Sequence, residues 1–231
     1  MTGRFDVITF DCYGTLIDWE DGIASAFLRE AAADGVALDR SGVVAAYHEV
    51  EPEVEASTYR PYREVLAATA IRVARRLGWG ISERRAEFLA ASLPDWQPFP
   101  DTNPALVALA GAGYRLGILS NVDDDLLEKT RRHFPVSFER NLVVTAQQVQ
   151  SYKPAHAHFL EARKRIDEAF PALLPGATWL HVAQSFFHDA VPARALGIPV
   201  AWINRKSEPR LGDVAPDVEL RNLTELADWL D

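Results

Sequence analysis

The feature that most constrains the fold is an alternation of short apolar runs with helical segments along the C-terminal half of the chain. The runs "RLGILS", "NLVVT", "TWLHVA" and "PVAWIN" have the length and residue types of buried strands, and an earlier apolar run, "VIT", begins at residue 7. Segments with helical periodicity separate them. Parallel strands need crossover connections, which helices usually supply. The alternation therefore predicts an α/β fold, with a parallel sheet and helices on both of its faces.

A different pattern occupies residues 19–92. Strand-like runs are few there, and long segments rich in Ala, Glu and Arg carry helical periodicity, such as "REVLAATAIRVARRLGW". The prolines of "PDWQPFPDTNP" then mark a linker. We therefore expect a core of residues 1–18 and 93–231, into which an all-helical domain of residues 19–92 is inserted.

Composition excludes several classes of function. The formal net charge is −9 and no stretch concentrates Lys and Arg, so we expect no nucleic-acid or membrane partner. The single cysteine, Cys12, rules out an intrachain disulfide framework and a cysteine-rich zinc site. No apolar stretch approaches the roughly 20 residues that cross a bilayer, and no secretory leader precedes the first strand. A cytoplasmic protein with a small-molecule partner is expected.

Polar residues follow the predicted strands and form the candidate site. In α/β sheets, ligands bind in the crevice beyond the carboxyl ends of the strands. Four groups of polar residues stand at such places: Asp11 to Thr15, Ser120 with Asn121, Lys153, and Gln184 to Asp189. The glycine turn in the first group allows a close approach to a ligand.

Each group also has an ordinary structural explanation. An aspartate after a strand, such as Asp11, is about as often a helix cap or a turn residue as a catalytic group. Ser120 and Asn121 could equally begin a turn or cap the next helix. Most lysines are solvated surface charges, which is the alternative for Lys153. Asp189 would also be favoured at a helix N-terminus by the helix dipole.

In combination, the four groups resemble the motifs of the haloacid dehalogenase superfamily. In chain order they are "DxxGT", "SN", "YKP" and an aspartate after the fourth strand. The resemblance spans about the whole chain. It implies a Rossmann-like core with a helical cap inserted after the first strand, which agrees with the helical character of residues 19–92.

The resemblance also implies a covalent mechanism without a metal ion. Asp11 would be a nucleophile whose carboxylate forms an ester that water later hydrolyses. Most members of the superfamily are magnesium-dependent phosphatases with two further acids, and here those positions hold Tyr13 and Gln184. Mg²⁺ prefers carboxylate ligands, and an alkoxide leaves poorly without a general acid. We therefore expect no metal and no cofactor.

The start of the chain points to chemistry at carbon. "DCYGTLID" is similar to the start of the (S)-2-haloacid dehalogenases, which also have a tyrosine two residues after the nucleophile. Halide leaves carbon without a proton, so its displacement needs neither a metal nor an acid. By this resemblance Tyr13 lines the substrate pocket, and Thr15 helps to position Asp11. Ser120 and Asn121 bind the substrate carboxylate or the leaving group.

Lys153 and Asp189 complete the implied site. The resemblance gives Lys153 the role of neutralising a cluster of carboxylates, and gives Asp189 that of orienting Lys153 and the hydrolytic water. The electrostatics are reasonable independently of any family. Two neighbouring carboxylates would raise one pKa and weaken the nucleophile, whereas a lysine between Asp11 and Asp189 keeps both ionised.

The cap departs from the dehalogenase pattern. Those enzymes carry an arginine on the first cap helix that helps to bind the substrate and the released halide, and the nearest equivalent in this chain is His48. Arg60 and Arg63 are the other candidates to supply the cation. The alternative for both arginines is an ordinary surface position.

The last motif departs from the pattern as well. Phe159 stands where the dehalogenases have a tyrosine, and Gln184 and Phe186 stand where they have a serine and an asparagine. Because these positions help to activate water, the hydrolytic step or the substrate range is in question. Ser185 and His188 are candidates to replace the missing polar groups. The alternative for His188 is simple packing at the start of a helix.

Three interpretations follow, in order of preference. The first is a metal-independent hydrolase that attacks C2 of a small 2-haloalkanoic acid through Asp11, giving a 2-hydroxy acid and halide. The second is a related hydrolase of another 2-substituted acid or of a phosphoester. The third is a degenerate member that binds a metabolite without turnover. The resemblance also suggests a homodimer.

Overall fold

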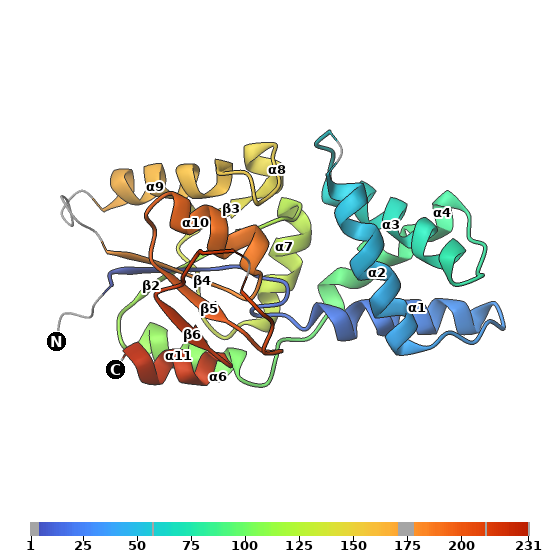
Figure 1. Ribbon diagram of the computed structural model, residues 1–231, viewed down its shortest axis with the longest axis horizontal. Helices are drawn as coiled ribbons and strands as arrows, with labels where there is room; N and C mark the ends of the chain where they lie inside the picture. The colour runs from blue at the N-terminus through green and yellow to red at the C-terminus, as the bar shows by residue number, and fades with distance from the viewer. Residues whose placement is uncertain (1–4, 57, 171–177, 211, 231) are drawn as a thin grey trace. The chain divides into compact units, whose positions relative to one another are not determined.

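The predicted parallel sheet is confirmed. The computed structural model describes residues 5–56, 58–170, 178–210 and 212–230 (Figure 1). Its sheet has the order β3-β2-β1-β4-β5-β6, and every neighbouring pair is parallel. The strands are β1 (Val7–Phe10), β2 (Arg115–Ser120), β3 (Val143–Thr145), β4 (Trp179–Ala183), β5 (Val200–Ile203) and β6 (Val218–Leu220). The central position of β1 places its carboxyl end in the middle of the sheet edge where ligands of such folds bind.

Helices cover both faces of the sheet, as predicted. Figure 1 shows α9 and α10 on one face and α6 and α11 on the other. The bounds in this part of the chain are α6 (Thr102–Gly111), α8 (Ala146–Val149), α9 (Ala157–Ala169), α10 (Val191–Ala195) and α11 (Leu223–Leu230). Short turns add η2 (Arg131–His133), η3 (Arg140–Leu142) and one π turn, η5 (Phe186–Ala190), which precedes α10 directly.

The insert is helical, as predicted. It contains α1 (Trp19–Ala33), α2 (Arg40–Glu55), α3 (Tyr62–Arg76), α4 (Glu83–Ala86), α5 (Phe88–Ser92) and the short turn η1 (Leu93–Asp95). Two helices begin where an aspartate side chain accepts a backbone N–H of the first turn: Asp18 at α1 and Asp39 at α2. Inside the insert, the ring of Phe27 packs edge-on against Trp79 and Phe88.

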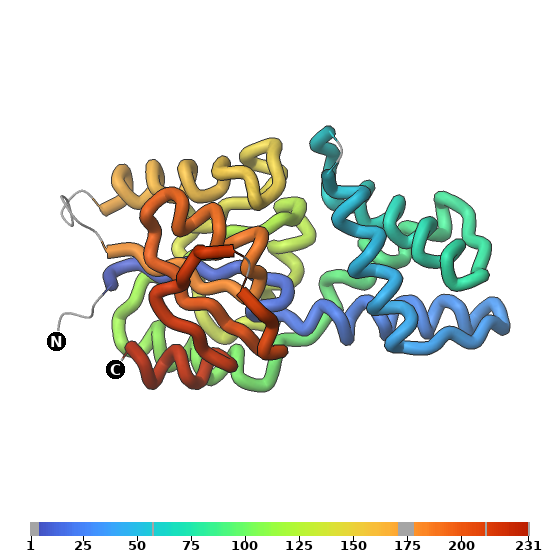
Figure 2. The backbone as a smooth tube through the Cα atoms, viewed as in Figure 1, coloured from blue at the N-terminus to red at the C-terminus, as the bar shows by residue number. Residues whose placement is uncertain are grey.

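The described chain divides into two compact units. One consists of Met1–Ile17, Pro98–Asn121 and His133–Asp231, and the other of Asp18–Gln97 and Val122–Arg132. The expected insert of residues 19–92 falls within the second unit, which also takes in α7 (Asp124–Thr130). The backbone leaves the sheet unit after Ile17 and returns to it at Pro98, and these two residues pair in an isolated antiparallel bridge. Figure 2 traces the backbone of both units.

The sheet is buried on both faces. All four residues of β1 are fully buried, as are most of those in β2, β4 and β5. Close packing explains the glycine in β2, because a Cβ at Gly117 would lie 2.6 Å from the carbonyl oxygen of Leu142. In the described part of the chain, no helix is both long and apolar enough to cross a membrane.

Two elements were not predicted. β6 is a three-residue edge strand with a half-exposed pattern, so it lacks the apolar run that marks the other strands. α11 is short and packs with α6. In addition, α7 ends as an α-helix at Thr130 and continues as the 3₁₀ turn η2.

Candidate active site

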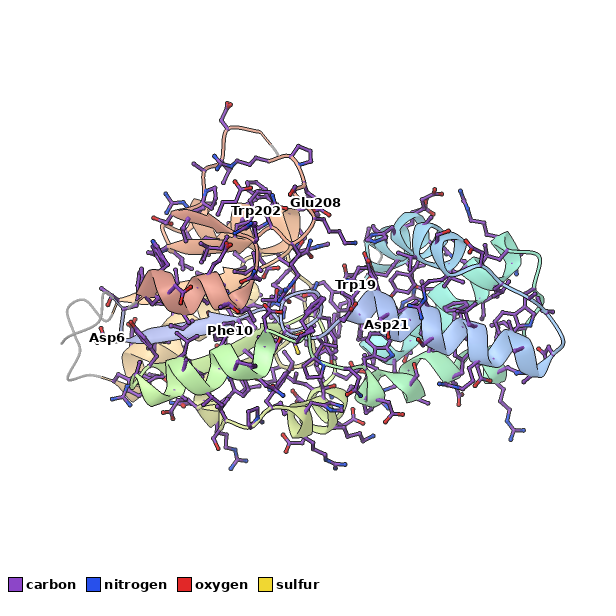
Figure 3. All side chains as sticks on the ribbon, turned by 90° about the horizontal axis from the view of Figure 1, so that it is seen from below. Asp6, Phe10, Trp19, Asp21, Trp202 and Glu208 are labelled. Carbon is purple, nitrogen blue, oxygen red and sulfur yellow. The ribbon has the colours of Figure 1, made fainter. Side chains whose placement is uncertain are left out.

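The site is built on the carboxyl ends of three neighbouring strands. Asp11 directly follows Phe10 of β1, whose ring is labelled in Figure 3, and Ser120 is the last residue of β2. Gln184 directly follows β4. Because β1 lies between β2 and β4, these strand ends are neighbours at one edge of the sheet. Lys153 enters from the segment between α8 and α9.

Lys153 joins the two aspartates. Its ammonium group donates hydrogen bonds to Asp11 Oδ1 at 2.9 Å, to Asp189 Oδ1 at 2.6 Å and to the carbonyl oxygen of Leu119 at 3.0 Å. The side chain is only 2% exposed. An ammonium has three protons, so these acceptors use its full donor capacity. A surface position for Lys153 is thereby excluded.

The second oxygen of Asp11 is held by Thr15. The Thr15 hydroxyl donates to Asp11 Oδ2 at 2.9 Å and accepts the backbone N–H of Gln184, also at 2.9 Å. Gly14 has a φ of 101°, a conformation that glycine adopts without strain, and this allows the tight turn between the two residues. Both oxygens of the Asp11 carboxylate are therefore oriented by the protein.

The two aspartates differ in how easily they take up a proton. Burial raises the pKa of Asp11 above its ordinary value, although Lys153 and Thr15 oppose the shift. Burial acts in the same sense on Asp189, but Lys153 and His181 outweigh it and lower that pKa to about 2. Burial would lower the pKa of Lys153, yet the two carboxylates raise it. The ammonium therefore stays charged, and Asp11 is the first of the pair to be protonated as the pH falls.

Ser120 and Asn121 have different environments. The Asn121 amide donates to the backbone carbonyl of Lys153 at 3.1 Å and accepts its backbone N–H at 2.7 Å. It therefore holds the lysine segment in place. The Ser120 side chain is 1% exposed, and its hydroxyl has no hydrogen-bond partner among the described residues. A buried hydroxyl normally finds a partner, so Ser120 is the more suitable donor to a ligand.

Ser185 and His188 form a local pair at the π turn. The Ser185 hydroxyl accepts the backbone N–H of His188 at 3.1 Å and lies 3.0 Å from Nδ1 of its ring. Burial lowers the pKa of His188. Ser185 thus caps the start of the π turn η5, and the predicted role of Ser185 and His188 at the site stays a prediction.

Gln184 contacts strand β5 and the loop that follows it. Its backbone carbonyl accepts the indole N–H of Trp202 at 2.7 Å, and its side-chain amide lies 3.5 Å from a carboxylate oxygen of Glu208. Trp202 and Glu208 are both labelled in Figure 3. The segment after β4 is thus fixed by backbone contacts that do not depend on the nature of the Gln184 side chain.

Tyr13 and the cap histidine lie in different units. Tyr13 is half-buried and follows Asp11 by two residues. His48 belongs to α2 of the helical unit, where its Nε2 lies 2.7 Å from Glu20 Oε1 and its ring packs edge-on against Trp19 at 5.0 Å between centroids. The predicted role of His48 in substrate binding stays a prediction.

The two cap arginines have partners inside the helical unit. Arg60 donates to the backbone carbonyl of Val54 at 3.4 Å. The Arg63 guanidinium donates to Asp123 Oδ2 at 3.1 Å and forms an ion pair with Asp125. Arg63 therefore has its charge balanced by two carboxylates.

Sequence reasoning missed a buried polar chain behind the site. His181 of β4 contacts Asp189 Oδ1 through Nε2 at 2.9 Å and the Thr9 hydroxyl through Nδ1, also at 2.9 Å. Trp179 donates its indole N–H to the same hydroxyl at 2.8 Å. Thr9 and His181 are register partners on adjacent strands. The only signal in the sequence was a polar residue inside each of two apolar strands.

The donor set does not fit a magnesium ion. The two acid positions of the related phosphatases hold Tyr13 and Gln184, and the remaining carboxylates, Asp11 and Asp189, are both bound by Lys153. Within the described ranges, no group of three or more His, Cys, Asp or Glu side chains is placed to hold a metal ion. We derive no catalytic step through a metal.

Comparisons with known proteins agree with this architecture. A family model described as haloacid dehalogenase-like hydrolase matches residues 5–177. The chain is 27% identical to (S)-2-haloacid dehalogenase H-109 of Pseudomonas putida, with 96% of each chain covered. It is 28% identical to another (S)-2-haloacid dehalogenase of Pseudomonas putida, over 96% of this chain and 95% of that one. It shares its fold with the L-2-haloacid dehalogenase of Xanthobacter autotrophicus carrying covalently bound chloropropionic acid, at a TM-score of 0.79 and 19% identity, over 97% of this chain and 98% of that one.

Proposed function

The chain belongs to the haloacid dehalogenase-like hydrolases, and within that family we propose that it hydrolyses small 2-haloalkanoic acids without a metal ion. The observation that carries the proposal is the buried Asp11–Lys153–Asp189 cluster next to a tyrosine and a glutamine at the phosphatase acid positions. The (S)-2-haloacid dehalogenases that match nearly the full chain support the same substrate class.

The first half-reaction needs an ionised and oriented nucleophile. An oxygen of the Asp11 carboxylate attacks C2 of the substrate, the new C–O bond forms, and the carbon–halogen bond breaks as halide leaves with its electron pair. Lys153 keeps Asp11 ionised despite its burial, and Thr15 fixes the plane of the carboxylate. Holding the nucleophile in one geometry supplies much of the advantage over the reaction in water.

The second half-reaction hydrolyses the ester. Water attacks the carbonyl carbon of esterified Asp11, the acyl C–O bond breaks, and a 2-hydroxy acid and one proton are released. Asp189 is the group proposed to orient this water. Its Oδ1 is bound to Lys153, whereas its Oδ2 is buried and has no hydrogen-bond partner among the described residues. A buried carboxylate oxygen without a protein partner is a suitable acceptor for water.

The substrate carboxylate needs positive charge or hydrogen-bond donors. The cluster holds two carboxylates for one ammonium, so it does not itself attract an anion. We propose that Ser120 supplies a hydroxyl and that the cap supplies a cation, for which Arg60, Arg63 and His48 are the candidates.

One observation favours the second interpretation, a related hydrolase with another leaving group. Phe159 is fully buried and packs edge-on against His181, and Phe186 packs edge-on against Trp202. By the resemblance stated above, these apolar rings stand where the (S)-2-haloacid dehalogenases have polar side chains that help to activate water. A different 2-substituted acid would then be the preferred substrate. The expected homodimer also stays a prediction.

Halide release from a panel of fluoro-, chloro- and bromo-2-alkanoic acids in EDTA tests the proposed function. We expect release from at least one acid at an unchanged rate with and without EDTA, because no step uses a metal. p-Nitrophenyl phosphate with Mg²⁺ serves as the comparison substrate. Turnover of the phosphate alone would refute the dehalogenase, and turnover of neither would favour another 2-substituted acid or binding without turnover.

The pH dependence should be asymmetric. We expect kcat/KM to fall on the acid side with an apparent pKa above 3.8, because burial raises the pKa of Asp11 and a protonated carboxyl does not attack carbon. On the alkaline side the activity should persist beyond pH 10.5, the ordinary pKa of lysine, because Asp11 and Asp189 raise that of Lys153. The measurement is kcat/KM against pH at constant ionic strength. A loss of activity near neutral pH would instead identify another titrating group.

A further inference from the structure

We propose that Trp179, Thr9 and His181 form a directional chain of hydrogen bonds that positions Asp189 for hydrolysis of the Asp11 ester. The inference rests on the proposed function, because it assigns these residues to the second half-reaction. His181 and Thr9 act through Asp189 and touch no reacting atom, so they are positioning residues.

The chain of hydrogen bonds is continuous and buried. Trp179 Nε1 lies 2.8 Å from the Thr9 hydroxyl, which lies 2.9 Å from His181 Nδ1. His181 Nε2 then lies 2.9 Å from Asp189 Oδ1, and that oxygen accepts the Lys153 ammonium at 2.6 Å. Thr9 and His181 are fully buried and Trp179 is 5% exposed. Hydrogen bonds shielded from water in this way are stronger than exposed ones.

The chemistry of the two ends fixes the direction of the chain. An indole N–H only donates, so the Thr9 oxygen accepts from Trp179. An ionised carboxylate only accepts, so His181 Nε2 must carry a proton and donate to Asp189. The Thr9 proton is then free to donate to an unprotonated Nδ1, which satisfies every group. A proton on Nδ1 would leave the Thr9 hydroxyl proton without its acceptor.

This chain of hydrogen bonds leaves one oxygen of Asp189 available to accept a hydrogen bond from water. Oδ1 accepts from both Lys153 and His181, which prevents rotation of the carboxylate. Oδ2 is buried and has no hydrogen-bond partner among the residues that the structure describes. When Asp11 becomes an ester, it loses its negative charge and Lys153 keeps Asp189 as its one anionic partner. The His181 donor therefore matters most during hydrolysis of the ester.

The variants Thr9→Val and His181→Phe test the proposal. Thr9→Val keeps the shape of the side chain and removes the hydroxyl, while Thr9→Ser keeps the hydroxyl. We expect kcat to fall about ten-fold in Thr9→Val, the upper size for loss of a neutral hydrogen bond, and further in His181→Phe, which removes a donor to the charged Asp189. Esterified Asp11 should accumulate in both variants under turnover, as measured by mass spectrometry, and Thr9→Ser should restore kcat.

Thr145→Val is the matched control. Thr145 is also a fully buried strand threonine. Its hydroxyl accepts the backbone N–H of Gln148, which is not part of the proposed chain of hydrogen bonds. Its kcat should stay within about two-fold of the wild type, with no accumulation of ester, because a general loss of packing does not select one step. Slower formation of the ester in Thr9→Val, or equal effects in Thr9→Val and Thr145→Val, would overturn the proposal.

A measurement without turnover separates this inference from the proposed function. Two-bond ¹H–¹⁵N correlation spectra of wild-type protein report which nitrogen of His181 carries the proton. We expect a proton on Nε2 and none on Nδ1, and a changed Nδ1 shift in Thr9→Val. A proton on Nδ1 would refute the proposed chain of hydrogen bonds, even if the enzyme is active. If the spectra are as expected but the protein releases no halide, the chain of hydrogen bonds stands and only the proposed dehalogenase activity is refuted.

Discussion

Asp11→Asn is expected to lower the rate of halide release by about 10⁴-fold or more, as for loss of a nucleophile in other enzymes with covalent intermediates. An amide oxygen is a poor nucleophile and carries no charge for Lys153 to stabilise. The substitution is nearly isosteric, but an amide has one acceptor oxygen, so it can accept the hydrogen bond of Lys153 or of Thr15 and not both. Release of halide by purified protein, with thermal unfolding as the check on folding, measures the effect.

Isotope labelling identifies the attacking oxygen in the wild type. In a single turnover in ¹⁸O-labelled water, the label should enter the Asp11 carboxylate and the product should receive an unlabelled oxygen from Asp11. This outcome follows because water attacks the carbonyl carbon of the ester. Label in the first-turnover product would show direct attack of water on C2, and substantial halide release by Asp11→Asn would agree with it.

Lys153→Met is expected to abolish activity and to destabilise the fold by about 3–5 kcal/mol. The substitution removes an ammonium that is 2% exposed and leaves Asp11 and Asp189 buried without their common cation. The pKa of one carboxyl must then rise further than the pKa of Asp11 does in the wild type, so the folded state of the variant is destabilised above that pKa. The lost stability should return in part as the pH falls through it, and the gain should be larger than any gain of the wild type, in which Lys153 opposes the shift. Urea unfolding at neutral and at mildly acidic pH measures both effects.

Lys164→Met provides the matched control for that experiment. Lys164 lies on the exposed side of α9 and undergoes the same change of side chain. Exposed substitutions usually change stability by no more than about 0.5 kcal/mol. If both variants unfolded alike, or if Lys153→Met retained activity, the ammonium would not be holding the two carboxylates together.

The location of the site was predictable, whereas its internal contacts were not. Asp11 and Gln184 follow apolar strands and Ser120 ends one, and the carboxyl ends of parallel strands meet at one edge of a sheet. Their convergence therefore needs only the periodicity of the sequence. The pairing of Thr9 with His181 depends on strand register, which periodicity does not give.

Contacts distant in sequence were also beyond prediction. Both amide atoms of Asn121 bind the backbone of Lys153, 32 residues later, while its expected part in binding the substrate stays a prediction. Arg63 was considered as a substrate ligand or a surface residue, and its partner Asp123 is 60 residues away. Such pairings follow from tertiary packing, which selects among side chains that have equal local preference.

The Asp123 side chain has a consequence for building chimaeras within this family. It is 1% exposed and accepts the backbone N–H groups of Tyr62 at 2.8 Å and Arg63 at 3.1 Å at the start of α3. The paired residues Ile17 and Pro98 suggest natural splice points for exchanging the helical insert. A graft exchanged only between these points would leave the buried Asp123 carboxylate without its hydrogen-bond donors on α3. A transplanted insert must therefore bring its own residues 122–132 or a neutral side chain at position 123.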